Sequence, residues 1–281
     1  MLLTHLFEDI YRSLSVPGNV HVAVNKHETK HRSGDLESIS TATPMPLRMT
    51  TSKSRGVPVY YAYNYQHSAE VTELLKALKG KSSMKLDDKQ LEHFFNDTAD
   101  YLTRGLKQHK IKPDIIVCPM SSGTLVKEFA IRLGKAMGGI RVVTDAFLKQ
   151  KAFKLEGDRT KGIEQCRDKF VDHDFIAIKY HGAEAEEFAT KVATTIYQSI
   201  KKHGSLELKD VYKLYGKFVK GFMDKQPNVE YEIMDKEVLI VDDVLSSGST
   251  MSEMSRLVRD ECLARTINGV VIFNMTSKAK S

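Results

Sequence analysis

Residues 237–250 read Glu-Val-Leu-Ile-Val-Asp-Asp-Val-Leu-Ser-Ser-Gly-Ser-Thr, and this stretch decides the fold. Its aliphatic run, residues 238–241, predicts a strand that is buried on both faces, as strands of parallel sheets are. Two carboxylates, Asp242 and Asp243, follow at the carboxyl end of that strand. A turn of small residues, 246–250, then opens a helix. A strand, a turn and a helix in this order are typical of α/β proteins.

Shorter apolar runs elsewhere in the chain repeat this alternation of strand and helix. Residues 114–119 predict a second buried strand, and a helix expected over 124–137 leads to a short apolar piece at 140–143. A last strand is expected over 269–273. Strands that alternate with helices form parallel sheets. The sequence therefore predicts an α/β fold with a Rossmann-like parallel sheet flanked by helices.

The chain divides into an N-terminal hood or helical region, residues 1–110, and a core, residues 111–281, with a helical insertion at about 146–236. The expected pieces of the N-terminal region are helices over 3–15, 68–79 and 87–109, a strand near 20–24 and an aromatic strand over 57–65. The insertion begins with a polar, basic run over 149–169. Two helices joined near Gly204 are expected over 183–225, because apolar residues recur there every four positions.

Composition limits the class of partner. The 281-residue chain has a net charge of +6, which suits an acidic ligand, and contact with nucleic acid is left open without being indicated. Three cysteines lie far apart without a CxxC pair, which argues against a disulfide framework and a zinc ribbon. No apolar run approaches the roughly 20 residues that span a bilayer. We therefore expect a cytoplasmic protein without a membrane partner, and a homodimer is left open.

The loop after the central strand suits a ligand with hydroxyls or a metal at one end and a phosphate at the other. Asp242 and Asp243 lie where ligands bind in open α/β sheets. The turn 246–250 offers backbone N–H groups, hydroxyls and the positive end of a helix dipole, which suit a phosphate dianion. Ribose 5-phosphate fits both ends. The GxxxxGK[ST] motif of a Walker loop does not occur in the chain.

Residues 238–250 resemble the 13-residue signature of type I phosphoribosyltransferases, and every fixed position matches. The resemblance implies the donor 5-phosphoribosyl-1-pyrophosphate (PRPP) and the cofactor Mg²⁺. It assigns the ribose hydroxyls, and Mg²⁺ directly or through water, to Asp242 and Asp243 as catalytic residues. It assigns the 5-phosphate to the turn, whose members are Ser246, Ser247, Gly248, Ser249 and Thr250.

Two further loops are implied by the resemblance. The pyrophosphate loop of the family corresponds to the turn after the strand at 114–119, formed by Met120, Ser121, Ser122 and Gly123. The family's mobile basic loop, which closes over the pyrophosphate and excludes water, corresponds to the run 149–169. Arg159 and Lys161 are its expected catalytic cations, because positive charge there offsets the charge that builds on the leaving group.

The resemblance implies a transferase of nucleotide metabolism, a pentosyltransferase that joins the phosphoribosyl group to a small acceptor and releases pyrophosphate. Ser246 stands where some 6-oxopurine transferases carry an acidic general base, which disfavours hypoxanthine and guanine as acceptors. Four tyrosines are available to stack on a base, although a half-buried strand explains them better; they are Tyr60, Tyr61, Tyr63 and Tyr65.

Two other classes of function stay open. A non-catalytic PRPP-sensing regulator or binding module would keep the loop, and its basic surface would contact nucleic acid. A diphosphokinase that makes the donor ranks third, because no internal repeat is visible. The order of elements is also loosely similar to the competence-associated ComF-like branch. That branch carries N-terminal zinc cysteines, whereas this chain has no cysteine before Cys118.

Overall fold

A computed structural model of the protein describes residues 48–51, 57–64, 75–81, 88–120, 124–149, 153–203, 211, 214–246 and 248–274. The helix expected over 3–15 and the strand expected near 20–24 lie outside the described residues.

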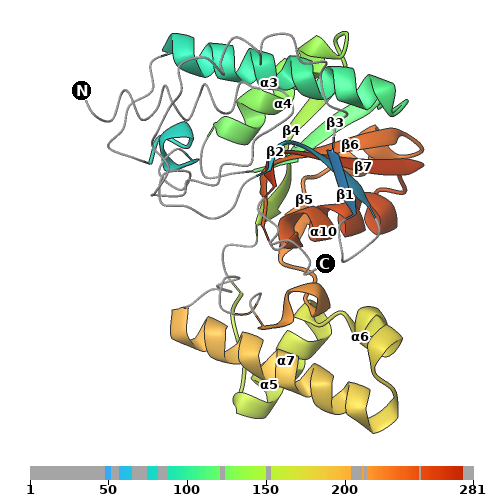
Figure 1. Cartoon of the computed structure of the whole chain (residues 1–281). Coiled ribbons are helices and arrows are strands. Elements are labelled where there is room, and N and C mark those ends of the chain that lie inside the picture. Colours follow the sequence, from blue (N-terminus) through green and yellow to red (C-terminus); the bar gives the residue numbers. More distant parts are fainter. Residues whose placement is uncertain are drawn as a thin grey trace, which may run out of the picture.

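Among the described residues, seven strands form one sheet in the order β1-β2-β7-β6-β3-β4-β5 (Figure 1). The strands are β1 (Arg48–Thr51), β2 (Pro58–Asn64), β3 (Ile115–Pro119), β4 (Arg141–Lys149), β5 (Met223–Lys225), β6 (Glu237–Leu245) and β7 (Thr266–Asn274). The five inner strands run parallel, and β1 and β5 pair antiparallel at the two edges. The predicted α/β fold with a parallel sheet is confirmed.

Helices cover both faces of the sheet (Figure 1). One face packs against α3 (Asp88–Gln108) and α4 (Leu125–Ala136), and the other against α10 (Ser249–Arg256), which continues as a π-helical turn over Leu257–Glu261. Side chains alternate between the faces of a strand. Leu239 and Val241 of β6 therefore join the α3 and α4 cluster, whereas Val238 and Ile240 join the α10 cluster. This explains why the run 238–241 is aliphatic throughout.

Three helices form a separate layer below the sheet in Figure 1, namely α5 (Arg159–Phe170), α6 (His173–Lys179) and α7 (Gly182–His203). The first of the two predicted insertion helices is α7, which buries Val192, Ile196 and Ile200, spaced four residues apart. The second ends earlier than predicted. Only 211 and 214–215 are α-helical among its described residues before a 3₁₀ turn, Gly216–Phe218, and a short strand, β5.

The expectation of a loop over 149–169 is wrong, because most of that run forms the helix α5. Asp158 begins the helix by accepting a hydrogen bond from the backbone N–H of Lys161 at 2.9 Å. The buried side of α5 consists of Gly162, Cys166 and Phe170, spaced four residues apart. Only Phe170 among these three is strongly hydrophobic. The apolar periodicity that indicates a helix is therefore weak in this run.

The helical layer is continuous with the sheet in its packing. One cluster of buried residues joins Met251 and Met254 of α10 to Cys166 of α5 and Val192 of α7. Strand β2, which precedes the predicted boundary at residue 110, lies inside the sheet beside β7. Within the described residues, no helix is both long enough and apolar enough to cross a bilayer.

Candidate functional site

The acidic pair lies at the carboxyl edge of the parallel sheet, as the sequence predicts. Strand β6 runs on to Leu245, so Asp242 and Asp243 belong to the strand itself. Both residues are largely buried, at 8% and 9% exposure, and the Asp243 backbone N–H donates to Asp242 Oδ1 at 2.9 Å. Carboxylates are costly to bury without a charged or hydrogen-bonding partner, and such positions are enriched in functional sites.

The same edge carries charged residues that the sequence reasoning missed. Asp145 lies on β4 with φ +57°, next to a register shift between β3 and β4. Its carboxylate is 3.7 Å from Lys127 Nζ of α4. The pKa of the neighbouring Cys118 thiol is raised to about 11, mainly by burial; the charges of Asp145 and Asp242 contribute to the rise, whereas a backbone hydrogen bond at Asp145 and the charge of Lys127 oppose it. Asp145 follows the apolar run 140–143, so the reasoning that selected Asp242 would also have found it.

The small-residue turn opens a helix as predicted. Gly248 adopts φ +79°, a left-handed conformation that glycine takes without strain, and it precedes the first residue of α10. Without a side chain it cannot cap the helix, and no side-chain cap bond is present there. Ser246 is exposed, Ser249 and Thr250 form the first turn of α10, and Ser247 lies outside the described residues.

The predicted pyrophosphate loop is only partly described. Met120 is 44% exposed, and its backbone N–H donates to the Phe147 carbonyl at 2.8 Å, which ties the end of β3 to β4. Ser121, Ser122 and Gly123 lie outside the described residues. Helix α4 begins at Leu125, so a strand is followed by a helix in the expected order.

A lysine from the N-terminal region also reaches the acidic pair. The ammonium of Lys79 forms an ion pair with Asp243 Oδ2, although Asp243 has only 12% of its side chain exposed. The sequence predicts a helix that ends at residue 79, but it indicates no role for Lys79. No local pattern signals this contact, since it joins two segments that lie far apart in the chain.

The structure places the two predicted loop cations elsewhere. Arg159 and Lys161 lie in the first turn of α5, in the helical layer, whereas the acidic pair lies on the sheet (Figure 1). Their catalytic role stays a prediction.

The tyrosines of β2 are core residues. Tyr60, Tyr61 and Tyr63 are each less than 10% exposed, and the hydroxyl of Tyr63 lies 3.0 Å from that of Thr98 on α3. The strand interpretation of these residues is confirmed for the described members. Tyr65 lies outside the described residues.

A buried ion pair ties the far part of α10 to the helical layer. Glu253 is 2% exposed and accepts hydrogen bonds from Arg256 at 2.9 and 3.0 Å, and from the Gly221 N–H at 2.6 Å. Burial by itself lowers the pKa of Arg256, but the hydrogen bonds and charges of Glu253 and Glu261 raise it overall. The helix that opens at the small-residue turn is thereby held at its other end.

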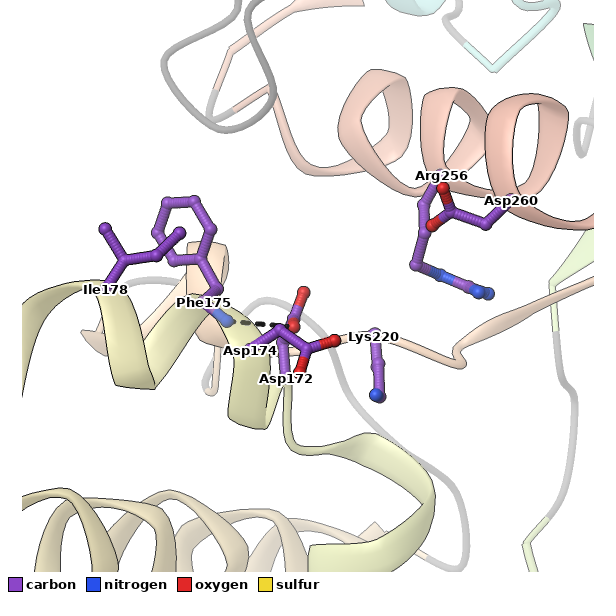
Figure 2. A pocket seen from close by; sticks show the side chains of 7 residues that line it. All are labelled: Asp172, Asp174, Phe175, Ile178, Lys220, Arg256 and Asp260. Atoms are coloured by element: carbon purple, nitrogen blue, oxygen red, sulfur yellow. Dashed lines mark hydrogen bonds between the residues drawn. The ribbon is translucent and has the colours of Figure 1, made fainter. Parts of the chain in front are cut away.

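A pocket of about 190 Å³ lies between α6 and the end of α10 (Figure 2). Three carboxylates line it, those of Asp172, Asp174 and Asp260, together with the cations Lys220 and Arg256. The guanidinium of Arg256 is already paired, so the pocket is acidic on balance and does not suit a phosphate. None of the predicted site residues lines it, which leaves the carboxyl edge as the candidate site.

One known family matches the part of the chain that carries the candidate site. The family model described as phosphoribosyl transferase domain matches residues 173–281, a segment that runs from α6 past β7 and holds the acidic pair and the small-residue turn. The match covers less than half of the 281 residues, and it does not distinguish the ComF-like branch. A search of curated proteins finds no match.

Proposed function

We propose that this protein, which carries a phosphoribosyl transferase domain at residues 173–281, binds PRPP with Mg²⁺ at the carboxyl end of β6. It then transfers the phosphoribosyl group to a nitrogenous base or a related nucleophile. One observation carries the proposal: Asp242, Asp243 and the helix-opening turn belong to a single strand–turn–helix unit, β6 to α10. This unit offers carboxylates for ribose and backbone N–H groups for a phosphate on one short loop.

The turn suits the 5-phosphate of the donor. The first N–H groups of a helix lack intrahelical partners, and the helix dipole favours negative charge at that end. Gly248 has no Cβ that could stand between the backbone and a phosphate, and its φ of +79° is one that glycine adopts without strain. The hydroxyls of Ser249 and Thr250 are at the same end of α10.

The residues at the edge fit a magnesium ion that arrives with the donor. Mg²⁺ is commonly held by one or two carboxylates together with phosphate oxygens of the substrate. The carboxyl end of β6 supplies at least one such carboxylate, and the described residues contain no cluster of three acidic, histidine or cysteine ligands that would form a complete protein cage. When bound, the ion offsets negative charge on the pyrophosphate.

The proposed reaction is a substitution at the anomeric carbon of ribose. A lone pair of the acceptor nitrogen forms a bond to that carbon, while the bond from the carbon to the pyrophosphate oxygen breaks and pyrophosphate leaves with the electron pair. The proton that the acceptor nitrogen loses goes to solvent or to a base on the acceptor side. The protein contributes mainly by holding donor and acceptor in line.

The test is pyrophosphate release from PRPP and Mg²⁺ across a panel of purines, pyrimidines, pyridine carboxylates and simple amines. We expect release with at least one acceptor, and expect it to fall in Gly248→Ala. The matched control is Gly138→Ala, which also replaces a glycine of positive φ (+96°) but lies in open space away from the edge.

Three outcomes separate the functions. Release that depends on Gly248 but not on Gly138 supports the transferase. Saturable PRPP binding without turnover of any acceptor contradicts the transferase and favours the PRPP-sensing regulator. Failure to bind PRPP at all contradicts both.

A further inference from the structure

Lys79 and Asp243 form an ion pair at the edge of the proposed donor site. The Asp243 side chain is 12% exposed and that of Lys79 is 33% exposed, so the pair is partly shielded from water. A carboxylate this deeply covered requires a cation or several donors to remain charged. Lys79 is the described cation that contacts the Asp243 carboxylate.

A well-formed turn positions Lys79. Residues 75–78 are helical, and Leu78 packs in the cluster that holds Tyr63 and Phe94. Gly80, at φ +64°, ends the helix, with hydrogen bonds from the Gly80 N–H to the Ala77 carbonyl at 2.9 Å and from the Lys81 N–H to the Lys76 carbonyl at 2.7 Å. These two bonds make a Schellman motif, which fixes the residue before the glycine. The ammonium therefore comes from an anchored backbone position.

The two carboxylates of the acidic pair face different neighbours. Asp242 lies in register with Val271 of β7, which belongs to the same buried cluster as Met251 and Met254 of α10. Residues in register on neighbouring strands share a face of the sheet. Asp242 is thus on the face of the sheet that packs against α10, the helix that follows the small-residue turn. Asp243 meets the turn at Lys79, whose neighbour Leu78 packs with α3 and α4.

We propose that the two carboxylates have separate roles, an inference that rests on the function proposed above. Asp242 meets the ribose hydroxyls or the metal of the donor. Asp243 is a positioning residue whose carboxylate forms an ion pair with Lys79. This ion pair holds residues 75–81 against the end of β6. An ammonium in contact with Asp243 repels a divalent cation from that oxygen, so the protein without donor offers a metal one carboxylate instead of two.

The first measurement is the affinity of the donor-free protein for Mn²⁺. Binding is monitored by the loss of the electron paramagnetic resonance signal of free Mn²⁺. Lys79→Met releases Asp243, and we expect affinity for Mn²⁺ to rise about tenfold as the nearby positive charge is removed. Lys79→Arg keeps the charge and should bind Mn²⁺ as the wild type does. The matched control is Lys76→Met, which removes an exposed lysine from the same helical turn. A purely structural role for Lys79 would leave Mn²⁺ affinity unchanged, and that result would overturn the proposal.

The second measurement is equilibrium binding of PRPP with Mg²⁺, together with the melting temperature. Asp242→Asn should lose about tenfold or more in donor affinity with little change in melting temperature, because a charged hydrogen-bond partner of the ligand is lost. Asp243→Asn should lose less than about threefold in affinity but melt earlier, since it leaves the Lys79 ammonium without its partner. Equal losses of donor affinity in the two variants, with unchanged melting temperatures, would contradict the division of roles.

The double variant Lys79→Met/Asp243→Asn keeps the test decisive if a single variant fails to fold. It removes both charges with near-equal volume, so it should melt above either single variant and retain PRPP binding within about threefold of wild type. Loss of PRPP binding in this folded variant would overturn the proposal. If the wild-type protein binds no PRPP, that result contradicts the proposed function instead. The Mn²⁺ affinities of the Lys79 variants and the melting temperatures of the single and double variants then still test the Lys79–Asp243 ion pair.

Discussion

The carboxyl edge of the sheet and the helical layer of α5, α6 and α7 both contact the helix α10. Their charged side chains differ in burial. At the edge, Asp242 and Asp243 are less than 10% exposed. In the helical layer, the ion pair between Arg167 and Glu186 has side-chain exposures of 31% and 65%. Exposed pairs add little to stability, whereas buried charges are costly and are retained where they serve a ligand or a fixed contact. The edge is therefore where we propose that the chemistry takes place, and the layer packs against it through α10.

The buried pair on α10 joins these two regions and gives the largest expected effect. Glu253→Ala removes the acceptor of the Gly221 N–H and two of the hydrogen bonds of the Arg256 guanidinium, which keeps its bond to Glu261. Breaking such a buried pair costs about 3–5 kcal/mol in free energy of unfolding. Urea unfolding measures it. Glu186→Ala, which removes an exposed partner in the layer, should cost no more than about 1 kcal/mol. Similar costs for the two variants would mean that α10 is not the joint between sheet and layer.

The backbone at Gly221 gives the next effect. Its φ is +70°, and a Cβ would lie 2.5 Å from the Lys169 carbonyl oxygen. Gly221→Ala should therefore cost about 2–4 kcal/mol, the sum of left-handed strain and a backbone clash. Gly138→Ala, at φ +96° with nothing within 4 Å, should show the strain alone, about 1–2 kcal/mol. If both substitutions lower the free energy of unfolding by the same amount, the close approach of Gly221 to the Lys169 carbonyl of α5 does not contribute to stability.

Buried thiols give a pH dependence that spans both regions. Burial raises the pKa of Cys118 and Cys262 to about 11 and that of Cys166 to about 12, from 9.0. Above pH 9 the unfolded chain releases these protons while the folded chain keeps them. Stability is therefore full below pH 9 and falls as pH rises towards 11. Each thiol should remove about 1 kcal/mol between pH 9 and 10.

Cys166→Ala isolates one of these contributions. Its free energy of unfolding, measured by urea titration at pH 8, 9 and 10, should fall less steeply with pH than that of the wild type by about the contribution of one thiol. Equal slopes in the two proteins would show that the thiol of the layer does not titrate differently on unfolding.

The smallest effect is expected at the start of α5. Arg159→Ala should change free energy of unfolding by less than about 0.5 kcal/mol, as surface substitutions usually do, and should leave pyrophosphate release within about twofold. The position of Arg159 in the helical layer is the reason. A loss of pyrophosphate release of tenfold or more would restore the catalytic role predicted for it, and would mean that the layer contributes to the chemistry.

The sequence predicts well those elements whose signal is local. The aliphatic run before Asp242 predicts β6, and the apolar spacing along Phe188 to Ile200 predicts α7. The helix α5 was missed because its buried side, Gly162, Cys166 and Phe170, carries little hydrophobicity. The place of β2 inside the sheet was missed because strand order depends on pairing between distant segments.

The candidate site divides in the same way. The signature identifies Asp242, Asp243 and the small-residue turn, because one short segment holds them all. Lys79 reaches the site only through the tertiary fold, from a turn set by Gly80 and by the packing of Leu78. Asp145 lies within β4 just after the apolar run 140–143, so its signal is local like that of Asp242. Contacts between distant segments require the three-dimensional structure.

Equilibrium binding of PRPP with Mg²⁺ to the wild type and to Asp242→Asn tests the central claim most directly. The control is Asp114→Asn, which removes an exposed carboxylate at the opposite end of β3, where it pairs with Arg265. We expect saturable binding that ribose 5-phosphate displaces, unchanged in Asp114→Asn and weakened by about 1.5–3 kcal/mol in Asp242→Asn, as for a lost charged hydrogen bond. Equal affinities in all three proteins, or no binding to the wild type, would contradict the placement of the donor at the end of β6.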